Sequence, residues 1–580
     1  MFRGMRTKPF PRFERRRVVD LSGLWEFGFV NGVHEPGVDL QAVDLASVNY
    51  HDRMLVPHAF DAAPAYAGRR GTAFYRTHFE QPAGRAARLH FEAVSMWCRV
   101  YVDGQPLREH ASGWSPFWVD VPPADHARRD LVVVVDNRFS FERVPLHEEY
   151  QDFYHWGGIL RPCWLHDTGA AWIDHVQVLV DDWKSGQVTL QVRLGGEQVP
   201  DEVELSVAWD AGEEEIWTGN QVVERTVRLS LEVPNARAWS PASPSLHTVR
   251  IGYAGDDMQV RFGLREINID GPRLMLNDEP IKLLGYNRHE SHPQFGPAVP
   301  VQVMLQDLQL MRSGGCNFIR GSHYPQDQRF LDLCDELGFL VWEESLGWGQ
   351  FERQLTDERF LSHHYAQLPE MVEASCNHPC IILWGFLNEL HSDKPFGRPV
   401  VEKSVDLLRS LDPTRLITYA TCRPDGDLCL DLVDIIALNL YPGWYGANGV
   451  PDGVRLIVPK IRALVAKFDA EHPGKPIMIS EIGAEALYGW RDAMNGFFTE
   501  EFQSRYDVEV AREVAGSERL VGLSIWHWAD ARTYQTSFAL GKPRAYNNKG
   551  VLDEYRRPKA AYHAVSEVYR SVCTPRPVGG

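Results

Sequence analysis

The sequence predicts a multidomain protein with two N-terminal β-sandwiches and a C-terminal (β/α)8 TIM barrel. Three observations predict this architecture. The chain has 580 residues, which is too many for one hydrophobic core. Its first half contains short strand-like runs separated by turns, and its second half alternates strand-like with helix-like segments. We expect three domains, which cover residues 1–168, 169–265 and 266–580.

The first half of the chain has the pattern of all-β domains. Its apolar runs are short, mostly rich in β-branched residues, and bounded by turn or polar residues. Asp103-Gly104 is typical of a two-residue hairpin turn. A seam near residues 167–172 separates a larger, jelly-roll-like, sugar-binding-like sandwich from a smaller immunoglobulin-like one. The strand candidates include Ala87–Phe91, Arg99–Val102, Leu131–Val135, Val176–Val180 and Val188–Val192.

Beyond Gly271 the pattern becomes strand, loop and helix, repeated. Eight apolar strands that alternate with amphipathic stretches predict a (β/α)8 barrel. A doubly wound open sheet is the alternative, but no G-x-G-x-x-G or Walker A loop favours it. The strand candidates are Ile281–Gly285, Asn317–Arg320, Leu340–Trp342, Ile381–Phe386, Leu416–Ala420, Ile435–Leu440, Ile477–Ser480 and Leu520–Trp526. The helix candidates include Val301–Met311, Asp327–Leu337, Val454–Asp469, Glu500–Val514 and Ala560–Val572.

The composition excludes several classes of partner. Lys+Arg 60 against Asp+Glu 78 gives a net charge of −18, so we expect no nucleic acid partner. No apolar run has the length of a membrane span, and the basic N-terminus has no apolar segment behind it, so we expect no membrane partner. The nine Cys are scattered, which favours a cytoplasmic protein with reduced thiols.

The spacing of two of the cysteines also raises the question of a metal site. Cys376, His378 and Cys380 lie close together in the sequence, but no second ligand pair with zinc spacing follows them. We therefore expect neither a metal nor another cofactor.

Polar side chains gather at the predicted carboxyl ends of the barrel strands, where barrel enzymes place their chemistry. Glu389 ends the very apolar run IILWGFLNE, and Glu481 ends IMISE. A carboxylate at the end of a buried strand costs free energy unless it is paired or functional. On strands four and seven these two carboxylates would face each other across the barrel mouth. Such a pair is what cleavage of a glycosidic bond needs.

Further motifs occur in order along the chain. The first domain contains LSGLWEF (21–27), VPHAFD (56–61), AFYRTHFE (73–80) and DFYHWGGILRPCWL (152–165). The barrel contains GYNRHE (285–290), IRGSHYP (319–325), NHPCIILWGFLNE (377–389), NLYPGWY (439–445), ISEIG (479–483) and IWHWAD (525–530). On these motifs most of the chain resembles glycoside hydrolase family 2, and within it the β-glucuronidases. The family architecture agrees with the pattern of strands and helices.

The resemblance implies a role for each carboxylate. Glu389, preceded by Asn388, is implied to be the general acid/base, and Glu481 the nucleophile of a retaining reaction through a covalent glycosyl-enzyme. Retention requires carboxyl groups about 5–5.5 Å apart. We expect apolar neighbours to raise the pKa of Glu389 and hydrogen-bond donors to keep Glu481 ionised. Ile482 and Leu390 replace the Tyr and Pro that are usual at these positions.

The sugar specificity is implied by the segment NNKG, residues 547–550. Asn547 and Lys549 match the N-x-K-G signature by which β-glucuronidases hold the substrate carboxylate. An ammonium and an amide donor bind a carboxylate through charge-assisted hydrogen bonds. Glucuronidases usually have an Arg four residues before this Asn; here that residue is Pro543, and Arg544 is the nearest candidate.

Six further side chains are implied to contact the sugar or to orient the nucleophile. An Asp from the first domain and two His from the barrel would bind sugar hydroxyls. Two Tyr would orient Glu481 or contact the sugar, and a Trp would stack under the sugar ring. They are Asp152, His289, His323, Tyr441, Tyr445 and Trp526.

We therefore expect a retaining, exo-acting β-glucuronidase that removes terminal β-D-glucuronic acid from small-molecule or oligosaccharide β-uronides, as a homo-oligomer (dimer or tetramer). The net charge does not exclude an acidic sugar, because salt screens charges that lie more than about 8 Å away at physiological ionic strength. A β-galacturonidase would use the same Asn/Lys pair. A β-galactosidase of the same family would make Lys549 incidental and would usually need a metal. The intact pair of Glu389 and Glu481 argues against a non-catalytic carbohydrate-binding protein.

Overall fold

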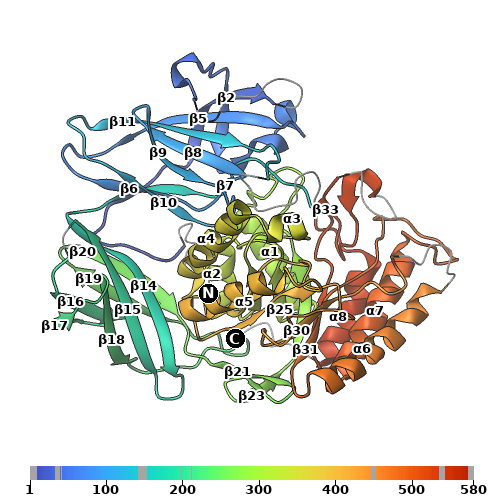
Figure 1. Ribbon diagram of the computed structural model, residues 1–580. Helices are drawn as coiled ribbons and strands as arrows, with labels where there is room; N and C mark the ends of the chain where they lie inside the picture. Colours follow the sequence, from blue (N-terminus) through green and yellow to red (C-terminus); the bar gives the residue numbers. More distant parts are fainter. Residues whose placement is uncertain are drawn as a thin grey trace.

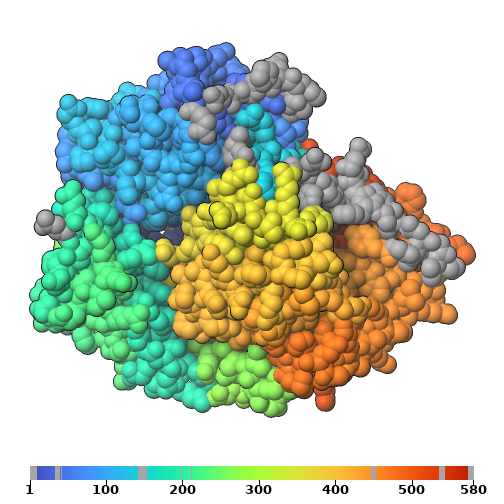
Figure 2. Space-filling view, in the orientation of Figure 1, coloured from blue at the N-terminus to red at the C-terminus, as the bar shows by residue number. Residues whose placement is uncertain are grey.

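A computed structural model describes residues 9–32, 40, 42–141, 153–197, 199–210, 212–445, 452–534 and 542–572. Their elements form two antiparallel sandwiches and one parallel barrel, which confirms the predicted fold class. The first sandwich (blue) and the second (green) lie beside the barrel, which is coloured from yellow to red (Figure 1). In the space-filling view the three regions abut one another (Figure 2). Among the described residues, no helix is both long and apolar enough to cross a membrane.

The first sandwich consists of a four-stranded and a six-stranded sheet around one core, with a small third sheet. Asp103 and Gly104 join β8 to β9 with φ of 48° and 75°, so the predicted hairpin turn is confirmed. The sheets comprise β1 (Val18–Asp20), β13 (Cys163–Asp167), β6 (Ala87–Phe91) and β10 (Phe117–Val121); β3 (Asp52–Val56), β2 (Gly23–Asn31), β5 (Gly71–Glu80), β11 (Arg128–Asp136), β8 (Trp97–Val102) and β9 (Gln105–His110); and β4 (His58–Ala59), β12 (Gly158–Ile159) and β7 (Val94–Ser95).

The second sandwich has sheets of three and four strands. The segment before β1, at the start of the described chain, packs against this second sandwich. Arg12 pairs with Gln259, and Arg16 forms a buried ion pair with Asp256 at 2.5 Å. The strands are β14 (Ala171–Asp182), β15 (Gln187–Gly196) and β18 (Thr226–Glu232), against β17 (Glu214–Gln221), β16 (Glu202–Trp209), β19 (His247–Tyr253) and β20 (Asp256–Phe262). A small antiparallel sheet of β21 (Ile267–Asp270), β22 (Arg273–Leu276) and β23 (Glu279–Ile281) follows and leads into the barrel.

The parallel sheet closes into a barrel because β24 pairs with both β25 and β32. The fifth strand was predicted as one segment but is divided at Tyr419, so that β28 pairs with β27 and β29 pairs with β30. The strands are β24 (Leu283–Arg288), β25 (Phe318–Gly321), β26 (Leu340–Glu344), β27 (Ile381–Gly385), β28 (Leu416–Thr418), β29 (Ala420–Thr421), β30 (Ile436–Asn439), β31 (Ile477–Ile482) and β32 (Leu520–Ile525). The turn after β32 contains the short pair β33 (Ala531–Arg532) and β34 (Tyr546–Asn547).

Helices alternate with the barrel strands, and each predicted helix is found. Asp327 caps α2 by accepting from the backbone N–H of Arg329 at 2.8 Å, and Gly338 ends this helix with φ of 74°. The helices are α1 (Val301–Ser313), α2 (Gln328–Leu337), α3 (Glu352–Leu355), α4 (Glu358–Ser375), α5 (Arg398–Leu411), α6 (Ile457–Glu471), α7 (Glu500–Gly516) and α8 (Ala560–Val572).

The first sandwich is attached to the barrel next to the mouth. Arg161, before β13, forms a fully buried ion pair with Glu290, after β24, at 2.9 Å. Trp114 stacks on Tyr324, after β25, with ring centroids 3.7 Å apart. A buried charge pair and an aromatic stack both require close packing, so this sandwich forms one wall of the barrel mouth.

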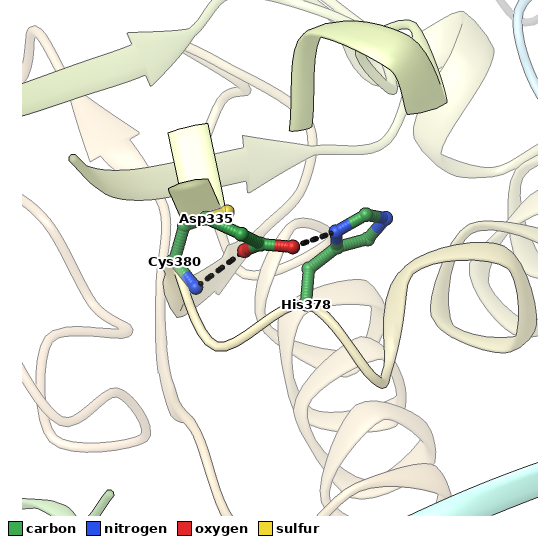
Figure 3. A group of neighbouring side chains, drawn as sticks. All are labelled: Asp335, His378 and Cys380. Carbon is green, nitrogen blue, oxygen red and sulfur yellow. Dashed lines mark hydrogen bonds and ion pairs between the residues drawn. The ribbon is translucent and has the colours of Figure 1, made fainter. Parts of the chain in front are cut away.

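Two of the three residues that were weighed as metal ligands, His378 and Cys380, belong to a buried group beside α2, whereas Cys376 does not. The ligand atoms of Asp335, His378 and Cys380 lie within 4.8 Å of one another (Figure 3). His378 Nδ1 is 2.6 Å from Asp335 Oδ2, and the backbone N–H of Cys380 donates to Asp335 Oδ1 at 3.0 Å. The second ring nitrogen of His378, Nε2, lies within hydrogen-bond distance of Gln328 Oε1, at 3.1 Å. These hydrogen bonds hold the loop before β27 against α2, which is a structural role.

Candidate active site

The two carboxylates predicted from the strand ends lie at the same end of the barrel. Glu481 belongs to β31 and is 4% exposed, whereas Glu389 follows β27 and is half-buried. The backbone of Glu389 has φ of 58°, and its N–H donates to the carbonyl of Ala420 at 2.9 Å. Asn439, at the end of β30, donates to Glu389 Oε1 at 2.8 Å and to Asn388 Oδ1 at 3.0 Å.

Arg320 connects Glu481 to Glu344 and Asn388. It is the next-to-last residue of β25 and is completely buried. Its guanidinium donates to Glu481 Oε1 at 2.9 Å, to Glu344 Oε1 at 2.6 Å and to Asn388 Oδ1 at 2.8 Å. It also donates to Asn287 Oδ1 at 3.1 Å. The sequence places Arg320 at a strand end but carries no signal for these partners, because they come from other strands.

The environment of Glu481 differs in part from the expected one. The expected donors are present, since Tyr441 donates to Glu481 Oε2 at 3.0 Å and Arg320 donates to Oε1. Nevertheless, burial raises the pKa of Glu481 to about 8; Arg320 opposes this rise, and the neighbouring charge of Glu389 adds to it. The expectation that these donors keep Glu481 ionised is therefore wrong, because burial, together with the charge of Glu389, outweighs Arg320 and Tyr441.

His323 and Trp526 form one wall of the site. Their rings are stacked, with centroids 5.2 Å apart and planes at 14°. His323 Nδ1 is 3.0 Å from Glu344 Oε2, and His323 Nε2 is 3.7 Å from Glu481 Oε1. Asn388 is fully buried, and its Nδ2 has no hydrogen-bond partner among the described residues. A buried amide donor without a partner is suited to receive a ligand hydroxyl.

His289 links the barrel to the first sandwich. Its Nδ1 is 3.1 Å from the hydroxyl of Tyr324, and its Nε2 is buried with no hydrogen-bond partner in the described part of the chain. Phe153 lies 4.8 Å from His289, ring centroid to ring centroid, so the first domain reaches the site as predicted. Asp152 itself lies outside the described residues.

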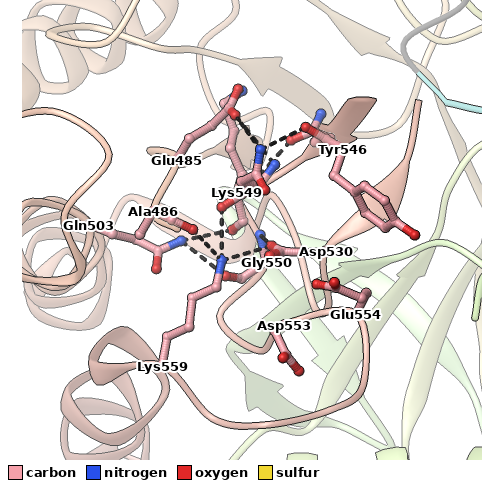
Figure 4. A network of polar contacts seen from close by, with 12 residues as sticks. Glu485, Ala486, Gln503, Asp530, Tyr546, Lys549, Gly550, Asp553, Glu554 and Lys559 are labelled. Atoms are coloured by element: carbon pink, nitrogen blue, oxygen red, sulfur yellow. Dashed lines mark hydrogen bonds and ion pairs between the residues drawn. The ribbon is translucent and has the colours of Figure 1, made fainter. Parts of the chain in front are cut away.

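Lys549 is a buried cation next to this site. It is completely buried, and its Nζ donates to the hydroxyl of Tyr445 at 2.8 Å. It also donates to Glu485 Oε1 at 3.2 Å (Figure 4). The ammonium lies 5.5 Å from the ring of Tyr441, whose hydroxyl contacts Glu481. Asn547 is 2% exposed, and its Oδ1 accepts from the backbone N–H of Lys549 at 3.4 Å. Lys549 is thus separated from Glu481 by Tyr441, and Asn547 holds the backbone of Lys549.

Arg544 has different partners from Lys549 and is more exposed. It has φ of 65°, donates to Glu554 Oε1 and to Asn548 Oδ1, both at 2.8 Å, and its side chain is 43% exposed. The cation that shares Glu485 with Lys549 is Lys542, at 3.0 Å. Sequence reasoning missed both Glu485 and Lys542. The available signal was that Glu485 follows Glu481 by four residues.

Comparison with known families agrees with this geometry. Residues 267–574 match the family described as "Glycosyl hydrolases family 2, TIM barrel domain", and residues 172–265 match "Glycosyl hydrolases family 2". The chain belongs to glycosyl hydrolase family 2. It is therefore a glycoside hydrolase, as the resemblance implied.

Relatives of this family 2 enzyme match it over most of their length. A β-glucuronidase of Streptococcus agalactiae is 28% identical over 593 residues, which cover 94% of each chain. A β-galactosidase of Thermoanaerobacter pseudethanolicus is 27% identical over 548 residues, covering 91% of this chain and 68% of that protein. The crystal structure of a family 2 β-galacturonidase from Eisenbergiella tayi, bound to galacturonate, has 33% identity and a TM-score of 0.84, covering 98% of this chain and 99% of that one.

Proposed function

We propose that this family 2 enzyme is a retaining, exo-acting β-glucuronidase that hydrolyses terminal β-D-glucuronic acid from glucuronides. The observation that carries the proposal is the position of Lys549. Its ammonium is completely buried and lies 5.5 Å from the Tyr441 ring, whose hydroxyl donates to Glu481. A buried ammonium beside the reacting groups stabilises a carboxylate on the sugar, whereas a neutral sugar has no group that requires it.

The proposed reaction has two steps. Glu389 donates a proton to the glycosidic oxygen while Glu481 attacks the anomeric carbon, which forms a covalent glycosyl-enzyme and releases the aglycone alcohol. Glu389 then accepts a proton from water as the water cleaves this intermediate. The proton on Glu389 has a second effect, because it removes the negative charge that helps to raise the pKa of Glu481. Protonation of the acid thus favours ionisation of the nucleophile.

This coupling predicts a change in the pH profile. Glu481 must be ionised to attack, and its pKa is raised to about 8, so for a substrate that needs no acid kcat/KM should rise with pH towards this value. Glu389→Gln removes the neighbouring charge and should lower the pKa of Glu481. We expect the acidic limb of the profile to move to lower pH. The measurement is kcat/KM against pH with a 2,4-dinitrophenyl glycoside, whose departure needs no acid. An unmoved acidic limb would contradict the coupling.

The proposed sugar is tested with the 4-nitrophenyl β-glucuronide, β-galacturonide and β-galactoside. We expect the uronides to have the higher kcat/KM. Lys549→Ala should lower kcat/KM for the uronides by about 10²-fold, since it removes a charge-assisted hydrogen bond, and should spare the galactoside. Equal or better turnover of the galactoside by the wild-type enzyme would overturn the proposal.

A second candidate function is β-galacturonidase activity. The specific observation in its favour is the 33% identity, over 98% of this chain, to the Eisenbergiella tayi β-galacturonidase. Glucuronate and galacturonate differ only in the configuration at C4, and both offer Lys549 a carboxylate. The ratio of kcat/KM for the two uronides in the same substrate series decides between them.

A further inference from the structure

Two buried lysines share one carboxylate beside the proposed sugar site. Lys542 Nζ lies 3.0 Å and Lys549 Nζ 3.2 Å from the same oxygen, Oε1 of Glu485. The three side chains are at most 3% exposed. The other oxygen, Oε2, accepts from Asn548 Nδ2 at 3.2 Å and from its backbone N–H at 3.4 Å. Glu485 therefore holds both ends of the turn between residues 542 and 549.

Glu485 is ionised in this group. Burial alone would raise the pKa of Glu485, but the ammonium groups of Lys549 and Lys542 outweigh burial and lower the pKa to about 2. Among the described ion pairs, the single carboxylate of Glu485 lies between two ammonium groups, and it offsets their combined charge only in part. The charge that remains on Lys549 is supported by aromatic rings, since its Nζ lies 4.8 Å from the ring of Tyr445 and 5.6 Å from that of Trp444.

The neighbouring cations have carboxylates of their own. Lys559 Nζ lies 2.8 Å from Asp530 Oδ1, in another part of the network (Figure 4). Arg544 lies 2.8 Å from Glu554. The sharing of one oxygen by two lysines is therefore particular to Glu485 among these described pairs.

We infer that Lys542 and Glu485 are specificity-determining positioning residues, which set the charge that Lys549 presents to the carboxylate of the substrate. Without Lys542, Glu485 would pair with Lys549 alone and would compete with the substrate carboxylate for it. Without Glu485, two buried ammonium groups would face each other, and repulsion would displace or deprotonate Lys549. The inference rests on the proposed function, since it assumes a uronide substrate.

The experiment is a double-mutant cycle of Lys542→Met and Glu485→Gln. Each single substitution should raise KM for the preferred 4-nitrophenyl β-uronide by about tenfold, with little change for the β-galactoside. In Glu485→Gln the uronide KM should also rise with pH, as one lysine loses its proton. The double variant should have a uronide KM closer to the wild-type value than either single variant, because it removes both the competing carboxylate and the repelling ammonium.

Binding of D-glucuronate and D-galacturonate, measured by titration calorimetry between pH 6 and pH 9, gives a readout that is independent of turnover. Lys282→Met is the matched control, because Lys282 is a half-buried lysine at the opposite end of β24 that donates to the carbonyls of Val514 and Ser517 at 2.9 and 2.6 Å. It should leave the ratio of uronide to galactoside KM unchanged. Thermal unfolding of each variant checks that it folds.

The possible failures can be told apart. If the wild-type enzyme prefers the galactoside, the proposed function fails. If it prefers a uronide but the double variant is as impaired as the two single effects combined, Lys542 and Glu485 act independently and this inference is overturned. An equal rise in KM for the uronide and the galactoside would mean a general structural role, and would overturn it too.

Discussion

Glu481→Ala is expected to lower kcat/KM on the preferred 4-nitrophenyl β-uronide by about four orders of magnitude or more, because it removes the proposed nucleophile of the glycosyl-enzyme step. The substitution removes the group that accepts from Arg320 and Tyr441 at 2.9 and 3.0 Å, and it leaves Glu389 in place. Steady-state kinetics with active-site titration of the wild-type enzyme measures the loss. A variant that keeps full activity would exclude Glu481 as the nucleophile.

Added azide separates the roles of the two carboxylates. In Glu481→Ala, azide can enter the space of the lost side chain and attack the anomeric carbon directly, which should give the α-glycosyl azide. In Glu389→Ala, azide should instead intercept the glycosyl-enzyme and give the β-glycosyl azide, since two displacements retain the configuration. Product analysis by NMR reads the configuration. The reverse assignment of products would exchange the roles of Glu389 and Glu481.

Arg320→Leu is expected to have the second-largest effect. Arg320 is fully buried and donates to Glu481, Glu344 and Asn388 at 2.6–2.9 Å, so its loss leaves buried carboxylates without their cation. We expect the free energy of unfolding to fall by about 3–5 kcal/mol. We expect kcat/KM to fall by about 10²- to 10³-fold, because Glu481 loses a charge-assisted hydrogen bond and its alignment.

The pH profile distinguishes this effect from simple destabilisation. Arg320 lowers the pKa of Glu481, so its removal should move the acidic limb of kcat/KM to higher pH. Arg288→Leu is the matched control. Arg288 ends the neighbouring strand β24, is equally buried, and donates to Gln326 at 2.8 Å. It should cost stability while leaving the acidic limb unmoved. A limb that shifts equally in both variants would exclude a direct action of Arg320 on Glu481.

Much of this architecture could be predicted from short stretches of sequence. Strands of the sandwiches and of the barrel follow from residue periodicity, which is a local property of the chain. Glu389 and Glu481 stand out because each ends a very apolar run. The division of the fifth strand at Tyr419 has no such signal, because it depends on hydrogen bonds to β27 and β30.

The cation near Lys549 shows why the site is harder to predict than the fold. Sequence spacing favours Arg544, which is three residues from Asn547. In the structure Arg544 has φ of 65° and pairs with Glu554, while Lys542 reaches Glu485. A single backbone conformation in the turn decides which cation lies at the site, and spacing carries no information on it.

The sequence by itself determined the two sandwiches, the barrel and the strands that carry Glu389 and Glu481, because periodicity and strand ends depend on neighbouring residues. Only the tertiary structure decided that Arg320 joins Glu481 to Asn388, and that Glu485 is shared by two lysines. These contacts depend on which strand ends and loops come together when the barrel closes. The pKa of Glu481 belongs to the same class, since burial and the charge of Glu389 exist only in the folded chain.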